Sequence, residues 1–229
     1  MIALTIGCAV ACAVLLVAEL RGPPWLRLVA KLVASAAFVG VGICALGHGP
    51  GHDDPAAVQL AHAIVTGLVL GAVGDACLAF RGKRWFLAGL VAFLLGHLAY
   101  VAGIAMVEPA EHWIGDAGWL AAAPIAVGVA ALIVMWPRLG AMRLPVIAYI
   151  ATITAMVIAA IAAARGAPLP AANRARLVVG ASAFFVSDLA VARERFLTSG
   201  VANKLWGLPA YYAGQLLLAW TIAGAGTNL

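Results

Sequence analysis

Eight long apolar runs, separated by short polar connections, dominate the chain. Apolar runs of about 20 residues can cross the roughly 30 Å hydrocarbon core of a bilayer as helices. Inside that core the backbone must satisfy its own hydrogen bonds, which excludes irregular structure in contact with lipid. We therefore expect an all-α polytopic membrane protein whose eight transmembrane helices form one bundle and a single transmembrane domain, residues 1–229. The expected spans are Ile2–Leu20, Leu28–Leu46, Ala57–Phe80, Trp85–Val107, Ala117–Trp136, Leu144–Ala164, Leu177–Ala192 and Lys204–Ala225.

The composition favours a membrane protein over a soluble one. Hydrophobic residues make up 65% of the chain and charged residues only 10%, against about 25% charged residues in ordinary soluble domains. The formal net charge of +5 comes from cations near the ends of the apolar runs, and no basic segment has interleaved aromatic residues. We therefore expect these cations to contact lipid headgroups, and we expect no nucleic-acid partner. The first run lacks a positive segment before it, so we expect a retained helix there rather than a cleaved signal peptide.

The placement of Lys and Arg predicts the orientation in the membrane. Cytoplasmic loops of membrane proteins carry an excess of these residues. Of the 14 in this chain, all but Arg165, Arg174 and Arg176 lie in or beside the first, third, fifth and seventh connections. We therefore expect these four connections in the cytoplasm and both termini outside. Their cations are Arg21, Arg27, Lys31, Arg81, Lys83, Arg84, Arg138, Arg143, Arg193, Arg195 and Lys204.

Two aspartates interrupt apolar runs at similar positions. Asp75 lies six residues before Arg81, and Asp188 lies five residues before Arg193, which places both roughly 8–9 Å inside the cytoplasmic boundary at about 1.5 Å per residue. An ionised carboxylate at the bilayer centre costs about 2.5–3.5 kcal/mol, and an aspartate near a helix C-terminus opposes the helix dipole. A cap or an interhelical hydrogen bond is the structural alternative, but we predict that both aspartates share one functional pocket. Ser187 could orient the Asp188 carboxylate or bond back to its own helix.

Further polar side chains fall in the same half of the membrane. His97 and Tyr100 are three positions apart and share a helix face, and Gln215 lies four and three positions from Tyr211 and Tyr212. Each of them could also serve only as an interhelical hydrogen bonder. The layout predicts a cavity that is open to the cytoplasmic leaflet, with these side chains on its walls.

We expect no metal and no cofactor. His48, His52, Asp53 and Asp54 lie together beside glycines and prolines, a composition typical of a solvated loop. No His-x-x-x-His or Glu-x-x-His pattern lies inside an apolar run, so the sequence does not predict a metal site within the membrane.

Four segments together resemble the YhhN family of integral membrane proteins. They are GDACL at Gly74–Leu78, FLAGLVAFLLGHLAY at Phe86–Tyr100, FVSDLA at Phe185–Ala190 and YAGQ at Tyr212–Gln215. Members of that family include lysoplasmalogenases, which hydrolyse the vinyl ether bond of lysoplasmalogens. The resemblance therefore implies a lysophospholipid substrate, cleaved to a fatty aldehyde and glycerophospho-ethanolamine or -choline. It also implies an integral protein of the bacterial inner (cell) membrane, in which membrane lipids and water are the other partners.

The two aspartates suit this chemistry. In vinyl ether hydrolysis an acid protonates the β-carbon, and water then attacks the resulting oxocarbenium ion. Burial away from water favours a protonated carboxyl group, and a second carboxylate can stabilise the cation and activate the water. We hypothesise that Asp75 and Asp188 form this catalytic pair, with the acid unassigned between them. The expected substrate-binding residues are His97, Tyr100, Ser187, Tyr211, Tyr212 and Gln215, and Lys83 and Arg84, with Arg81, at the phosphate.

A proton-coupled transporter of a small molecule or lipid is the alternative function. Paired intramembrane aspartates with a histidine also carry protons in transporters. A lipid-binding or structural membrane protein without turnover is a third possibility. An enzyme releases aldehyde in detergent without a sealed compartment, whereas a transporter needs closed vesicles.

Overall fold

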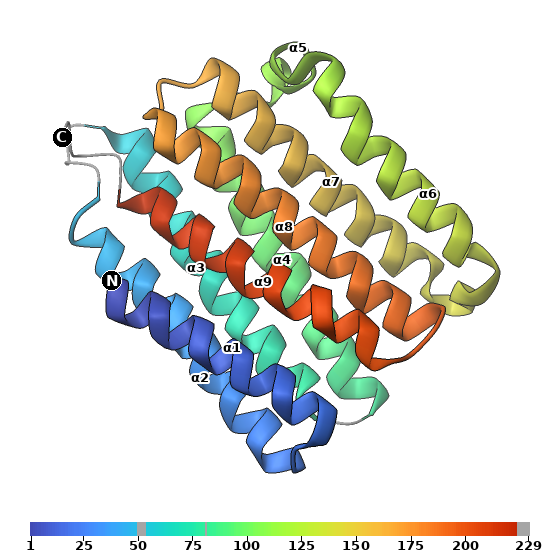
Figure 1. Cartoon of the computed structure of the whole chain (residues 1–229). Coiled ribbons are helices and arrows are strands. Elements are labelled where there is room, and N and C mark those ends of the chain that lie inside the picture. The colour runs from blue at the N-terminus through green and yellow to red at the C-terminus, as the bar shows by residue number, and fades with distance from the viewer. Residues whose placement is uncertain (50–53, 81, 224–229) are drawn as a thin grey trace.

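The structure, a computed structural model, describes residues 1–49, 54–80 and 82–223. These residues form helices and their connections, and no strand occurs within the described ranges. The long helices lie side by side in one bundle, with the N-terminal pair at one edge and α6 at the other (Figure 1). They are α1 (Ile2–Arg21), α2 (Pro24–Leu46), α3 (Pro55–Leu78), α4 (Lys83–Val107), α6 (Ala122–Leu139), α7 (Arg143–Gly166), α8 (Ala171–Phe196) and α9 (Val201–Ile222).

The all-helical prediction is confirmed, whereas the number of helices that cross a membrane stays a prediction. Six stretches of the described residues are long and apolar enough to cross. Five of them are α1, α2, α3, α4 and α8, and the sixth, Ala110–Gly166, is 57 residues long and contains both α6 and α7. Helix α9, which is 22 residues long, is not among the six.

The outward-facing surface of the bundle is apolar, as a lipid environment requires. On α1 the exposed side chains recur every three or four residues and form one stripe along the helix. A large exposed apolar face of this kind is costly in water and favourable in lipid. The stripe consists of Ile2, Ile6, Val10, Val14 and Val17.

Helix α8 begins earlier than predicted. The polar stretch from Arg165 to Arg176 was expected to be a connection, but only the four residues after Gly166 and before Ala171 separate α7 from α8. Arg174 Nε donates to the Leu169 carbonyl at 2.6 Å, and Arg176 Nη1 donates to the Trp220 carbonyl at 3.2 Å. Each guanidinium group thus has a carbonyl partner within the bundle, which lets both arginines lie inside the helix.

The segment before α6 also differs from the prediction. The expected helix Ala117–Trp136 begins five residues later, as α6 at Ala122. It is preceded by η1 (Ala110–His112), α5 (Trp113–Ala117) and η2 (Gly118–Ala121). Gly118 adopts a φ of 57°, which interrupts the regular helix between α5 and η2. Helix α6 then continues past Pro137 to Leu139, followed by η3 (Gly140–Met142).

Helix α3 packs closely against α4 and α9 because it carries glycines on the shared face. A Cβ added at Gly74 would lie 2.7 Å from the Phe93 ring of α4, and one at Gly71 would lie 3.1 Å from the Tyr211 hydroxyl of α9. Only a residue without a side chain allows helices to approach this closely. The approach brings Asp75, which follows Gly74, into the interior of the bundle, where it is 3% exposed.

Candidate active site

A cavity of about 470 Å³ lies at one end of the bundle. It is bounded by the C-terminal parts of α1, α3, α6 and α8 and by the N-terminal parts of α2, α4, α7 and α9. This is the end at which most Lys and Arg residues lie. Both Asp75 and Asp188 line the cavity. Two aspartates that are far apart in the sequence therefore reach one hollow.

Asp75 is held by donors on both carboxylate oxygens. Lys31 Nζ of α2 lies 3.2 Å from Asp75 Oδ1, and the Ser35 hydroxyl donates to Asp75 Oδ2 at 2.6 Å. Lys31 and Ser35 are four positions apart, so both project from one face of α2. An ammonium group at this distance stabilises an ionised carboxylate inside a medium of low dielectric constant. The arrangement fits an acceptor-only carboxylate at Asp75.

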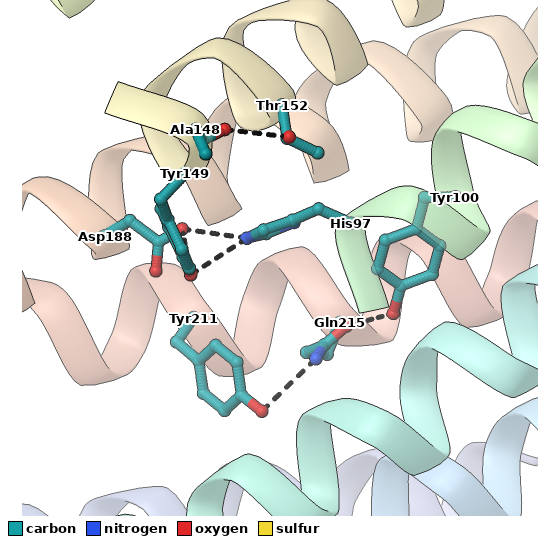
Figure 2. A network of polar contacts seen from close by, with 8 residues as sticks. All are labelled: His97, Tyr100, Ala148, Tyr149, Thr152, Asp188, Tyr211 and Gln215. Atoms are coloured by element: carbon teal, nitrogen blue, oxygen red, sulfur yellow. Dashed lines mark hydrogen bonds and ion pairs between the residues drawn. The ribbon is translucent and has the colours of Figure 1, made fainter. Parts of the chain in front are cut away.

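Asp188 has a different set of partners (Figure 2). His97 Nε2 of α4 lies 3.0 Å from Asp188 Oδ2, and the Tyr149 hydroxyl of α7 donates to the same oxygen at 3.0 Å. His97 is completely buried, and its Nδ1 has no hydrogen-bond partner among the described residues. The tautomer with the proton on Nε2 therefore suits the site, since a proton on Nδ1 would lack an acceptor. The second oxygen, Asp188 Oδ1, accepts no hydrogen bond within the described ranges.

A second polar chain lies behind the cavity wall. The Tyr100 hydroxyl donates to Gln215 Oε1 at 2.7 Å, and Gln215 Nε2 donates to the Tyr211 hydroxyl at 3.2 Å (Figure 2). The Phe184 ring packs beside this chain, with its centroid 4.4 Å from that of His97 and 5.3 Å from that of Tyr211. These contacts fix the orientation of Tyr211, the member of the chain that lines the cavity.

The predicted site residues are divided between the cavity and the structure behind it. Asp75, Asp188, Ser187 and Tyr211 line the cavity. Four others, expected on its walls, do not line it and are buried behind them: His97, Tyr100, Tyr212 and Gln215. His97 still touches Asp188, whereas the Tyr212 hydroxyl has no hydrogen-bond partner among the described residues.

The expected phosphate-binding cations do not reach the cavity. Lys83 and Arg84 are exposed at the start of α4 and are not lining residues. Arg81 lies outside the described residues. Three other cations line the cavity instead, which are Lys31, Arg195 and Lys204.

Other charged side chains line the cavity near α1, α8 and α9. Lys204 Nζ pairs with the Glu19 carboxylate at 2.6 Å, and the Arg195 guanidinium lies 4.4 Å from the centroid of the Phe86 ring. Glu194 accepts a hydrogen bond of 2.6 Å from Asn203 Nδ2. These groups give one part of an otherwise apolar cavity an ionic lining of both signs.

Sequence reasoning missed Lys31, Ser35 and Tyr149. Lys31 was interpreted as a cation at the membrane boundary, but it lies eight residues into α2 and pairs with Asp75. Its spacing of four from Ser35 inside an apolar run was the available signal. Tyr149 stands alone in its run, and only the packing of α7 against α4 and α8 brings it to Asp188.

Of the loop residues with metal-binding side chains, the structure describes His48 and Asp54. Neither belongs to a group of three potential metal ligands among the described residues. Asp54 instead caps α3, where its Oδ1 accepts the Ala57 amide at 3.0 Å, and His48 Nδ1 lies 3.0 Å from the Cys44 carbonyl. His52 and Asp53 lie outside the described residues. The cavity itself has no group of three close His, Cys, Asp or Glu ligands among the residues that the structure describes.

Comparison with known proteins agrees with the motifs in the sequence. Two curated relatives, from Mycobacterium bovis and Mycobacterium tuberculosis, are named lysoplasmalogenase, and each is 33% identical over 178 residues, covering 71% of this chain and 64% of the relative. The match thus spans less than two thirds of the length of these relatives. No solved structure matches the chain. The model of the YhhN family matches residues 26–222, most of the sequence, and the protein therefore belongs to the YhhN family.

Proposed function

We propose that this protein is a membrane hydrolase that cleaves the vinyl ether bond of a lysoplasmalogen to a fatty aldehyde and a glycerophospho-alcohol, with all eight long helices crossing the membrane. The observation that carries the proposal is the meeting of Asp75 and Asp188 at one cavity. Membership of the YhhN family and the two relatives named lysoplasmalogenase support the choice of substrate.

The lining of the cavity matches an amphipathic substrate. Apolar side chains such as Leu78, Phe93 and Met135 give the alkenyl chain a surface that excludes water. Arg195 and Lys204 offer the cations that a phosphate needs, a role first expected of Lys83 and Arg84. In this proposal the phosphate lies on the ionic side of the cavity and the vinyl ether lies between the two aspartates.

We assign the acid to Asp188. No Lys or Arg among the described residues lies within ion-pairing distance of its carboxyl group, and only Oδ2 is engaged, by His97 and Tyr149. A partly buried carboxylate without a cation is costly, so a proton on the free Oδ1 relieves that cost. Asp188 donates this proton to the β-carbon of the vinyl ether, and the electron pair of the double bond forms the new C–H bond.

Asp75 serves as the base because Lys31 and Ser35 hold it as a carboxylate. It stabilises the oxocarbenium ion and removes a proton from the water that attacks the α-carbon, which gives a hemiacetal. When the hemiacetal collapses, Asp75 returns that proton to the leaving oxygen, and the hemiacetal hydroxyl returns a proton to Asp188. Positioned acid and base groups contribute about 10²–10⁴-fold each in rate.

The remaining predicted residues support this pair. His97 orients Asp188 from behind the wall, and Ser187 and Tyr211 contact the substrate from the lining. Tyr100 and Gln215 hold Tyr211 through their hydrogen bonds. Tyr212 packs beside the Tyr211 ring, with ring centroids 5.0 Å apart.

Aldehyde release by purified protein in detergent tests the proposal. We expect turnover of an alkenyl lysophospho-ethanolamine, and we expect Asp75→Asn and Asp188→Asn each to lose at least about 100-fold of it. Asp54→Asn is the matched control, because Asp54 caps the opposite end of α3 and asparagine caps equally well. Full activity in either variant would overturn the roles of the aspartates. Proton-coupled uptake in sealed vesicles without aldehyde release would support the transporter instead.

A further inference from the structure

A cluster of three potential metal ligands lies at the opposite end of the bundle from the cavity. Glu108 follows the last residue of α4, His112 ends η1, and Asp116 lies in α5. One ligand atom from each lies within 4.8 Å of the others. The sequence positions are four apart, and the intervening turns bring all three side chains to one place.

Glu108 is the unusual member of this cluster because it is buried. Its side chain is only 4% exposed, and its carboxylate accepts no hydrogen bond from the described residues. The Trp113 indole donates to the Glu108 backbone carbonyl at 2.7 Å. This indole therefore holds the backbone of Glu108 and does not bond to its carboxylate. His112 Nδ1 lies 3.4 Å from Glu108 Oε1.

Within the described part of the chain, the one ion-pairing partner of Glu108 is His112, which itself belongs to the cluster. No Lys or Arg in the described part of the chain lies within ion-pairing distance of Glu108 or Asp116. Both carboxylates lie against the last residue of α7, since a Cβ added at Gly166 would meet Glu108 Oε2 and would lie 2.7 Å from Asp116 Oδ2. The C-terminal ends of α4 and α7, which carry negative dipole ends, therefore meet two carboxylates. A bound cation would offset the cost of holding these two carboxylates together.

We propose that Glu108, His112 and Asp116 bind a divalent transition-metal cation, for which Zn²⁺ is the best fit. An imidazole nitrogen with carboxylate oxygens is a ligand set for Zn²⁺ rather than for Mg²⁺ or Ca²⁺. Tetrahedral Zn²⁺ with bonds of about 2.0–2.1 Å holds its ligand atoms about 3.3 Å apart. The distance of 3.4 Å between Glu108 Oε1 and His112 Nδ1 already fits this value. A small movement of the half-buried Asp116 side chain toward these two atoms completes the set.

The bound cation would act as a structural clamp. It joins the end of α4 to η1 and α5, and it lies against the end of α7. A water molecule fills the fourth position, because the exposed His112 side leaves the site open to solvent. The site is separate from the cavity, which is lined by the opposite ends of α4 and α7. Its presence does not depend on the proposed hydrolysis.

Titration of metal-free protein tests the site without an activity assay. Full-length, tag-free protein in detergent is stripped with a chelator and titrated with Zn²⁺, Mn²⁺, Ca²⁺ or Mg²⁺ by calorimetry, and Tm is followed in parallel. We expect one Zn²⁺ per chain and a higher Tm in its presence, because a ligand that binds only the folded state stabilises it. Glu108→Gln and Asp116→Asn should each weaken Zn²⁺ binding by more than about tenfold.

Glu111→Gln is the matched control, since Glu111 is an exposed carboxylate of the same segment and is not part of the cluster. It should bind Zn²⁺ as the parent protein does. Asp116→Asn keeps the test decisive if Glu108→Gln does not fold, because Asp116 is only half-buried. No stoichiometric Zn²⁺ binding, undiminished binding in Asp116→Asn, or equal binding of Ca²⁺ and Zn²⁺ would each overturn the proposal.

Discussion

At Asp75 both carboxylate oxygens have donors, Lys31 and Ser35, whereas at Asp188 two donors share a single oxygen. This difference between two otherwise similar aspartates gives each its proposed role. A carboxylate paired with an ammonium group is held ready to accept a proton, and a partly buried carboxyl group without a cation is suited to carry one. The assignment therefore depends on the partners of each residue and not on its depth in the bundle.

The Tyr149 hydroxyl offers a test at the scale of one atom. Tyr149→Phe removes the hydrogen bond of 3.0 Å to Asp188 and keeps the ring against His97. Asp188 becomes charged as it gives up its proton, and a hydrogen bond to a charged group is worth about 1.5–3 kcal/mol. We therefore expect kcat for aldehyde release to fall by about tenfold or more, with Tm little changed. Thr152→Val on the same helix is the control, because Thr152 bonds only to the Ala148 carbonyl of its own helix. An unchanged kcat in Tyr149→Phe would show that the hydroxyl does not act on the acid.

The sequence predicted that the two aspartates share a pocket with His97 nearby, but not their other partners, Lys31, Ser35 and Tyr149, for a physical reason. An aspartate in an apolar run is conspicuous because its burial is costly without a function or a partner. Lys31 resembled the boundary cations beside it, and Tyr149 resembled an ordinary apolar wall residue. Their contacts arise from the packing of α2 on α3 and of α7 on α4 and α8. Such contacts between helices have no signature within either helix.

At the scale of elements, α3 packs closely against α4 next to the site. Gly74→Ala would push a Cβ to within 2.7 Å of the Phe93 ring. Overpacking in a close-packed interior costs about 1–3 kcal/mol, so we expect a lower free energy of unfolding. We also expect slower aldehyde release, because the added Cβ displaces Asp75. Gly7→Ala in α1 is the control, since nothing lies within 4 Å of its added Cβ. Unfolding in detergent–denaturant mixtures measures the difference. Equal stability of the two variants would contradict the close packing of α3 on α4.

The helix boundaries were predictable where polar residues lie beside helix-breaking glycine or proline residues. The end of α1 is such a case, because it was expected at Leu20 and lies at Arg21, directly before Gly22 and Pro23. Helix α2 starts at Pro24, four residues before the expected Leu28. The start of α8 was not predictable in this way. Arg174 and Arg176 lie within the helix because the Leu169 and Trp220 carbonyls accept their hydrogen bonds. A charged residue therefore marks a helix end only if no partner in the bundle satisfies it.

At the scale of the whole molecule, the two ends of the bundle differ in charge. The cavity lies at the end with most Lys and Arg residues, and the Glu108 cluster lies at the other. By the positive-inside rule, we expect the cavity on the cytoplasmic side. A membrane-impermeant maleimide tests this in intact cells, with Cys44 and Cys77 replaced by Ser. We expect Glu111→Cys to be labelled and Ser199→Cys to be labelled only after permeabilisation, since both positions are exposed. The reverse pattern would invert the orientation.

The central claim is that a carboxyl group of this cavity protonates the β-carbon of a vinyl ether. The most direct measurement is the mass of the aldehyde that is formed from an alkenyl lysophospholipid in D₂O and trapped by reduction at once. Protonation at carbon predicts one deuterium on the carbon next to the former carbonyl, formed rapidly by the parent protein and at a rate at least about 100-fold lower by Asp188→Asn. Aldehyde without deuterium at that carbon, or equal rates in the two proteins, would contradict the claim.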